Sequence, residues 1–183
     1  AAIEELDRLA DAGIELVTLM PIAPFPGQRG WGYDGVGMYA VHEAYGGPEA
    51  LQRFVNAAHA RGLGVGLDVV FNHQGPDGNY LGMYGPYFSH RHQTPWGHGA
   101  NLDGPGSDAV RAYIIGAALR WFEDFHVDAL RLDAVHALVD DSPRHLLAEL
   151  ADETEALSAR LGRPLALIAE SDRNDPLTVT PTS

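Results

Sequence analysis

Short apolar runs alternate along this chain with longer stretches in which apolar residues recur at helical spacing. No other feature of the sequence restricts the fold as strongly, because such alternation is typical of parallel βαβ units. The predicted strands are residues 14–22, 64–72, 127–135 and 165–170. The predicted helices are residues 2–12, 48–61, 107–125 and 142–161. Ser107 and Ser142 are the expected N-caps of the last two helices, since a serine hydroxyl accepts a hydrogen bond in the first turn.

Polar residues at the ends of the predicted strands decide between the two folds that fit this alternation, a doubly wound sheet and a (β/α)₈ barrel. Asp68 and Asn72 lie towards the end of one strand, Arg131 and Asp133 towards the end of the next, and Glu170 ends the last. Barrel enzymes build their sites from the C-terminal ends of several strands. No Gly-rich phosphate loop follows any predicted strand. We therefore predict an α/β chain with the (β/α)₈ TIM-barrel fold.

Two long connections, residues 24–47 and 73–106, show neither helical nor strand periodicity. Connections of this length in compact domains are usually functional or disordered, and their aromatic residues argue against disorder. Tyr33 and Trp96 are candidates for platforms that stack on a sugar ring. The histidines of the second connection lack a tight metal-ligand spacing, so we predict no metal site there. They are His90, His92 and His98.

Asp133 and Glu170 are the candidate catalytic carboxylates. Arg131 and Asp133 lie two residues apart on one strand, so their side chains share a face. The guanidinium should favour an ionised, oriented carboxylate, as a glycosidase nucleophile requires. Glu170 follows the apolar run 165–169, an environment that can raise the pKa of a carboxyl and suits a general acid. We expect the two carboxyls about 5–5.5 Å apart, the separation of a retaining mechanism.

Each of these residues also has a purely structural interpretation. Asp68 alone is more typical of a buried structural acid, and His73 alone of a loop histidine with satisfied hydrogen bonds. Arg131 and Asp133 could form only an ion pair, and Glu170 could cap the following segment. The combination favours a site, because three successive strands end in the same chemistry.

The chain of 183 residues has a formal net charge of −13 and no cysteine. Such a surface repels nucleic-acid backbones and anionic lipid, so we expect neither as a partner and favour a neutral substrate. No apolar run reaches the length of a membrane span. Glu4, Glu5 and Asp7 stand where a secretory signal would have a basic start, so no signal is predicted.

Three motifs resemble sequence regions of the α-amylase superfamily, in the same order and at similar intervals. They are DVVFNH at 68–73, LRLDAVH at 130–136 and the strand-ending Glu170. Within the superfamily the chain most resembles a trehalose-releasing group, and this resemblance spans nearly the whole chain. It rests on WGYDGVGMYAVHEAYGGPEAL (31–51), FNHQGPDGNYL (71–81), HQTPWG (92–97), NLDGPGS (101–107), LRLDAVHALVDDSP (130–143) and AESDRND (169–175). His136 and Ala137 stand where ordinary α-amylases commonly have Lys and His.

The resemblance implies a glycoside hydrolase that cuts the α-1,4 bond next to the terminal trehalose of a maltooligosyl trehalose. It implies Asp133 as the nucleophile and Glu170 as the acid/base. Arg131 would orient the nucleophile, and Tyr33 would stack on the bound glucosyl unit. The full set of substrate-binding positions is then Tyr33, Asp68, Asn72, His73, Arg131 and His136.

The resemblance also implies a partial barrel. Residues 1–175 would cover about barrel strands 2 to 5, and residues 176–183 would form a loose tail. The third catalytic carboxylate of the family, an Asp late in the barrel, has no counterpart in this sequence. An open half-barrel leaves sheet edges unpaired, so the segment alone is expected to be inactive.

Three alternatives stay open. A glucan branching enzyme would transfer chains to another sugar instead of to water. A non-catalytic barrel relative would have no need for Asp133, Glu170 and Arg131 together. A metal-dependent barrel hydrolase would lose activity with chelators, whereas we expect neither metal nor cofactor. The family resemblance and the acidic, cysteine-free composition favour a cytoplasmic location, and the sequence leaves the oligomeric state unknown.

Overall fold

Four parallel strands form the central sheet of this computed structural model, which describes residues 2–176. They are β1 (Leu16–Leu19), β2 (Gly64–Val69), β5 (Ala129–Leu132) and β6 (Ala166–Ala169), in the order β1-β2-β5-β6. Asp68 of β2 lies opposite Arg131 of β5, and Leu132 lies opposite Ala169 of β6. All four predicted strands are present but shorter than predicted. Residues 177–183, most of the expected tail, lie outside the described residues.

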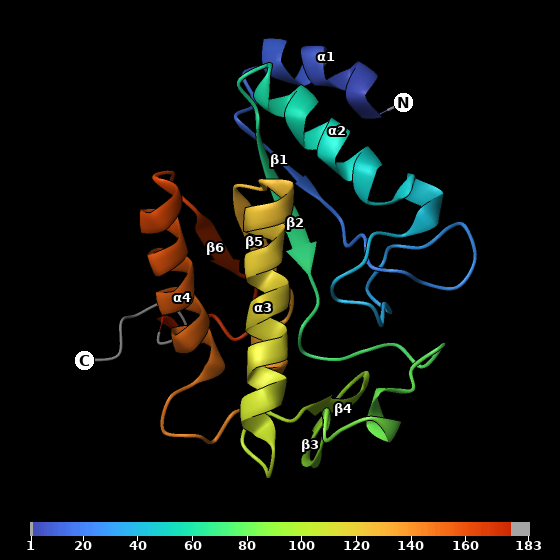
Figure 1. Ribbon diagram of the computed structural model, residues 1–183, viewed down its shortest axis with the longest axis vertical. Helices are drawn as coiled ribbons and strands as arrows, with labels where there is room; N and C mark the ends of the chain where they lie inside the picture. Colours follow the sequence, from blue (N-terminus) through green and yellow to red (C-terminus); the bar gives the residue numbers. More distant parts are fainter. Residues whose placement is uncertain (1, 177–183) are drawn as a thin grey trace.

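Helices connect these strands in the predicted order. They are α1 (Leu6–Asp11) after the 3-10 helix η1 (Ala2–Glu5), α2 (Gly47–His59), α3 (Ser107–Phe125) and α4 (Leu146–Leu161). Further 3-10 turns are η2 (Glu43–Tyr45), η3 (Leu81–Met83) and η4 (Val135–Ala137). Figure 1 shows α3 and α4 side by side in front of β5 and β6. No helix among residues 2–176 is long and apolar enough to cross a membrane.

Both predicted serine caps are wrong. The N-cap of α3 is Gly106, whose φ of 79° is left-handed, and Ser107 is already helical. Helix α4 begins at Leu146, four residues after the predicted cap Ser142. The Ser142 hydroxyl instead bonds to Asp140 within a local turn, which keeps this segment out of the helix. His145 caps α4, because its Nδ1 accepts a hydrogen bond of 3.1 Å from the Leu147 N–H.

The second long connection contains a hairpin that the sequence analysis missed. β3 (Phe88–Thr94) pairs antiparallel with β4 (Gly97–Ala100). The Thr94 Oγ1 accepts from the Trp96 N–H at 3.1 Å and donates to the Gly97 carbonyl at 3.0 Å, which closes the turn. The strands escaped detection because β3 is mostly polar and half-exposed, so it lacks an apolar alternation.

The core lies between the sheet and its helices. β2 has neighbours on both sides and is buried from Val65 to Val69, whereas β1 and β6 alternate between half-buried and exposed residues. Phe122 of α3 is fully buried, and such a ring contributes about 3–5 kcal/mol to stability. Leu16 and Ile168 are about two-fifths exposed, at 39% and 43%, on the strands that form the edges of the described sheet.

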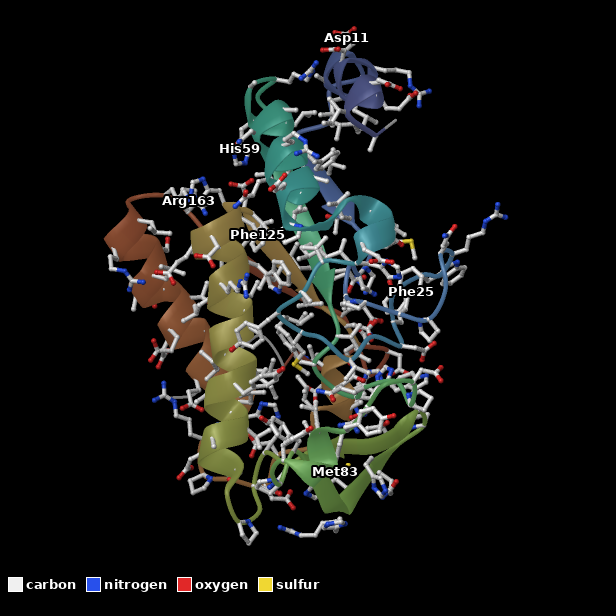
Figure 2. The ribbon with its side chains drawn as sticks, turned by 45° about the vertical axis from the view of Figure 1, so that its right-hand side comes forward. Asp11, Phe25, His59, Met83, Phe125 and Arg163 are labelled. Atoms are coloured by element: carbon white, nitrogen blue, oxygen red, sulfur yellow. The ribbon has the colours of Figure 1, made fainter. Side chains whose placement is uncertain are left out.

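A polar cluster fastens the N-terminal ends of the central strands. Asp128, just before β5, accepts hydrogen bonds from His59 Nε2 and the Val65 N–H, both at 2.8 Å. Its other oxygen accepts from Arg163 Nη1 at 3.2 Å. Figure 2 shows His59 and Arg163 on the half of the molecule away from Met83. In barrels this end serves stability, which leaves the opposite end for chemistry.

Candidate active site

The C-terminal ends of β2, β5 and β6 bring the predicted site residues together. The Asp133 N–H donates to the Val69 carbonyl and the Glu170 N–H to the Leu132 carbonyl, both at 3.1 Å. Parallel pairing therefore continues one residue beyond β5 and β6. It places the candidate nucleophile and the candidate acid at one edge of the sheet.

Arg131 is the centre of the site. Its Nη1 donates to Asp68 Oδ2 at 2.5 Å and to Asp133 Oδ1 at 3.3 Å, and its Nη2 lies 3.5 Å from Glu170 Oε2. The predicted contact with Asp133 is present, but Asp68 is the closer partner. One guanidinium thus holds three carboxyl groups from three strand ends within reach of one another. Negative groups outnumber the cation, which favours a transition state that gains positive charge.

Asp133 is held from two directions. Besides Arg131, Asn72 Nδ2 donates to the Asp133 backbone carbonyl at 2.8 Å and to its Oδ2 at 3.2 Å. Asn72 is fully buried, and the Asp133 side chain is only 15% exposed. These donors fix the direction of the carboxylate, which a nucleophile needs for in-line attack.

Glu170 is more open than Asp133, with a side chain 38% exposed. Its Oε2 accepts a hydrogen bond of 2.8 Å from the Ala134 N–H, and its backbone carbonyl accepts from the Val135 N–H at 2.9 Å. The carboxyl therefore faces a cation and a peptide N–H, in place of the apolar surroundings expected from the preceding run. Ala134 has a φ of 43°, a left-handed conformation that is strained for alanine.

Asp68, which is buried, and Tyr33, which is half-buried, form a pair beside Arg131. The Tyr33 hydroxyl donates to Asp68 Oδ2 at 2.8 Å. Burial raises the pKa of Asp68, although the bonds from Tyr33 and Arg131 oppose this. Burial, followed by the hydrogen bond to Asp68, raises the pKa of Tyr33 to about 12. Sequence reasoning gave Tyr33 a stacking role, and the structure adds this anchoring role for its hydroxyl.

His73 continues the site towards the hairpin. Its Nδ1 lies 2.6 Å from Asn72 Oδ1, and burial lowers the pKa of its imidazole. The ring stacks on Trp96, with centroids 5.1 Å apart and planes at 25°. His136, on η4, lies just beyond Asp133 along the chain, and its Nδ1 is 3.5 Å from Asp172 Oδ1. Asp172 was not foreseen, although it stands two residues after Glu170.

The loop after η4 is fixed by a residue that sequence reasoning missed. Arg111, buried on α3, donates to Asp140 Oδ2 at 2.6 Å and to Glu149 Oε2 at 2.8 Å. It also donates to the carbonyls of Leu102 and Arg144. The signal in the sequence was an arginine on the apolar side of a helix, which normally has a buried partner.

The hairpin histidines do not converge on one point. His92 Nε2 lies 2.8 Å from Asp103 Oδ2. Together with Asp141, these side chains offer ligand atoms within 4.8 Å of one another, close enough to hold an ion. Arg91 already lies against both acids, at 3.6 Å from Asp103 and 3.1 Å from Asp141. The guanidinium supplies the positive charge that a cation would bring, so we assign no metal role to this group.

Known proteins resemble this chain in sequence. The model of the alpha amylase catalytic domain matches residues 2–85. A malto-oligosyltrehalose trehalohydrolase of Mycobacterium tuberculosis is 62% identical over 180 residues, which are 98% of this chain and 31% of that protein. A 1,4-alpha-glucan branching enzyme of Synechococcus sp. is 35% identical over 134 residues, which are 70% of this chain and 17% of that protein.

A solved structure shares the fold. The crystal structure of a Salmonella typhimurium protein, described as a candidate alpha amylase, matches 94% of this chain and 29% of its own. The TM-score is 0.87 at 46% sequence identity. The predicted TIM-barrel class is thereby confirmed, and the four-stranded sheet is a segment of such a barrel. The chain spans about a third of the length of the curated trehalohydrolases that it matches, 31% in the mycobacterial case.

Proposed function

Because this chain is part of an α-amylase-family catalytic domain, we propose that it supplies the nucleophile and the acid/base of a trehalose-releasing retaining glycosidase. The substrate class is a neutral maltooligosyl trehalose. One observation supports this proposal more strongly than any other. The Arg131 guanidinium contacts Asp68, Asp133 and Glu170 from three successive strand ends, which brings together the pair of carboxyls that a retaining glycosidase uses.

In the first step, a carboxylate oxygen of Asp133 attacks C1 of the glucosyl unit next to trehalose. The bond from C1 to the glycosidic oxygen breaks, and protonated Glu170 gives its proton to that oxygen. Trehalose leaves as a neutral alcohol, and the glucosyl unit stays covalently bound to Asp133. The hydrogen bonds from Asn72 and Arg131 keep the Asp133 carboxylate oriented towards C1 during this step.

In the second step, Glu170 takes a proton from water, and the water oxygen attacks C1 on the face that trehalose left. The bond between C1 and Asp133 breaks, so the anomeric configuration is retained. Both steps pass through a cationic sugar that the surrounding carboxylates stabilise. A third catalytic carboxylate would come from outside the sequence of this chain.

The remaining site residues have places around the glucosyl unit. Asp68 and His73 lie on the same strand end as Asn72, where Asp68 Oδ1 and His73 Nε2 can each accept from a sugar hydroxyl. The Tyr33 ring would stack on the pyranose while its hydroxyl stays on Asp68. His136, whose Nδ1 lies 3.5 Å from Asp172 Oδ1, would contact the substrate from the segment that follows Asp133.

Glucan branching is the second candidate, and the Synechococcus relative supports it. The two reactions share the covalent intermediate and differ in the acceptor, which is water or a sugar hydroxyl. The higher identity to the trehalohydrolase favours hydrolysis. From the family resemblance and the acidic, cysteine-free composition we propose a cytoplasmic location, with no nucleic-acid or membrane partner.

The test uses protein expressed from the gene extended to the length of its curated relatives. This protein is incubated with maltooligosyl trehalose and, separately, with amylose. Chromatography should find free trehalose as the main product of the first substrate. New branch points on amylose without trehalose would replace this proposal by glucan transfer. Asp133→Asn is the matched control, because it keeps the shape of the side chain and removes the nucleophile. It should bind the sugar while losing almost all turnover, and near-normal turnover would refute the nucleophile assignment.

A further inference from the structure

Trp96 occupies the tip of the β3–β4 hairpin and reaches from there to the site. The indole stacks on the imidazole of His73, with ring centroids 5.1 Å apart and planes at 25°. Both hydrogen bonds of Thr94 Oγ1 fix the turn that carries it. Trp96 is 49% exposed, whereas the His73 beneath it is only 5% exposed. The turn of the hairpin therefore covers the buried His73 with the indole of Trp96.

A short chain of hydrogen bonds leads from this histidine to the nucleophile. The Asn72 Oδ1 can only accept, so His73 Nδ1 must carry the proton in their 2.6 Å contact. With its oxygen turned to His73, the Asn72 amide presents its NH₂ group to Asp133. That group donates to both the backbone carbonyl and Oδ2 of Asp133. The orientation of the His73 ring thus decides which end of the Asn72 amide meets the nucleophile.

We infer that Trp96 is a positioning residue, which holds the His73 ring in the plane that directs Asn72 onto Asp133. The kinetic part of this inference rests on the proposed function, and the ring contact itself does not. Stacking of two flat rings restricts rotation about the side chain of the smaller one. Loss of the indole frees the imidazole to turn, and the Asn72 amide then loses the partner that fixes it.

The surroundings of His73 make its protonation a measure of this contact. Burial lowers the pKa of His73, while the carboxylates of Asp133 and Asp34 act in the opposite direction. His98 of β4 lines the same pocket and is the other titratable imidazole there. Removal of the indole lets water reach the ring, which weakens the effect of burial and leaves that of the carboxylates. The pKa of His73 should then rise.

The first experiment measures the pKa of His73 by NMR titration of histidine-labelled protein. The protein is expressed from the gene extended to the length of its relatives. His73→Gln identifies the His73 signal, and His98→Gln that of His98. Trp96→Ala should raise the pKa of His73 measurably, whereas Trp96→Phe, which keeps a flat ring, should leave it near the wild-type value. An unchanged His73 pKa in Trp96→Ala would overturn the inference, whether or not the protein releases trehalose.

The second experiment is a double-mutant cycle on trehalose release, with kcat and KM measured separately. Trp96→Ala should lower kcat about 10-fold, as expected for a misplaced reacting group, and Trp96→Phe should recover most of the loss. In a His73→Ala background, Trp96→Ala should have little further effect, because its route to Asp133 is already gone. A full effect in that background, or an effect on KM alone, would mean that Trp96 only contacts sugar. Absence of trehalose release by the wild type would instead refute the proposed function and leave the NMR result standing.

Discussion

Replacement of Arg111 by alanine should destabilise the segment that follows strand β5. Arg111 is 8% exposed and joins α3 to Asp140 in that segment and to Glu149 on α4. The Asp140 side chain is completely buried. Arg111→Ala therefore leaves a buried carboxylate without its cation, which is the costly way to break a buried ion pair.

The magnitude follows from the donors that remain. Removal of one partner of a buried pair costs about 3–5 kcal/mol. Asp140 would still accept from Ser142 and from the Leu146 N–H, so we expect a value near the lower limit, about 3 kcal/mol. Arg160→Ala is the matched control, because Arg160 and its partner Glu123 are both exposed. Such a surface pair contributes about 0–1 kcal/mol.

The same pair predicts a dependence on pH. Burial would raise the pKa of Asp140, but the bonds from Ser142 and Arg111 outweigh it and lower this pKa below the ordinary value of 3.8. A lowered carboxyl pKa stabilises the fold above its unfolded-state value, and this contribution disappears as the pH falls through the folded-state value. Arg111→Ala should therefore lose stability near neutral pH and differ progressively less from wild type as the pH falls below 3.8 and through the lowered folded-state pKa of Asp140.

The assay is urea unfolding of both variants, expressed from the gene extended to the length of its relatives. Hydrogen exchange of the backbone amides of α4 is then measured in the same proteins. Exchange is needed because a larger protein can unfold in several steps. A loss below 1 kcal/mol for Arg111→Ala, or a loss equal to that of Arg160→Ala, would refute the reasoning. The Asp140 carboxylate would then have found water or another cation.

Two further predictions concern the site itself. Glu170→Gln should strongly suppress release of trehalose. It should suppress release of a good leaving group, such as dinitrophenolate from an aryl glycoside, much less, because only the poor leaving group needs a proton. Equal losses would exclude Glu170 as the acid. Tyr33→Phe removes one hydrogen bond from the Asp68 carboxylate, so the pKa of Asp68 should rise further above its ordinary value. The acidic limb of the pH profile of kcat/KM should then move to higher pH, and an unmoved limb would show that ionised Asp68 is not required.

Much of the fold could be predicted because its signals are local. The helices and strands have apolar periodicity over many residues, and α3 was predicted with its observed bounds, 107–125. Element ends were less predictable, since Ser142 bonds to Asp140 and leaves the capping of α4 to His145. The hairpin was missed because its strands are polar, although the Pro-Trp-Gly sequence at 95–97 marked a turn.

The sequence predicted which residues lie together at these strand ends, but not how their side chains pair. The spacing of two residues placed Arg131 beside Asp133, as the structure confirms. That Arg131 lies closer to Asp68 follows from the register of β2 against β5, which sets the two residues directly opposite each other. Register between strands 63 residues apart in sequence is a property of the folded sheet, so one sequence does not reveal it. The partners of Arg111 were hidden for the same reason.

A single peptide group links the supports of the two proposed catalytic carboxylates. The carbonyl of Asp133 accepts from Asn72, and the N–H of the next residue, Ala134, donates to Glu170. These two atoms belong to one planar unit that does not twist. A tilt of this plane would therefore move the hydrogen-bond partners of Asn72 and Glu170 at the same time. Residues that tolerate left-handed backbone, such as glycine and asparagine, should keep this peptide plane in place at position 134, whereas valine or isoleucine should tilt it.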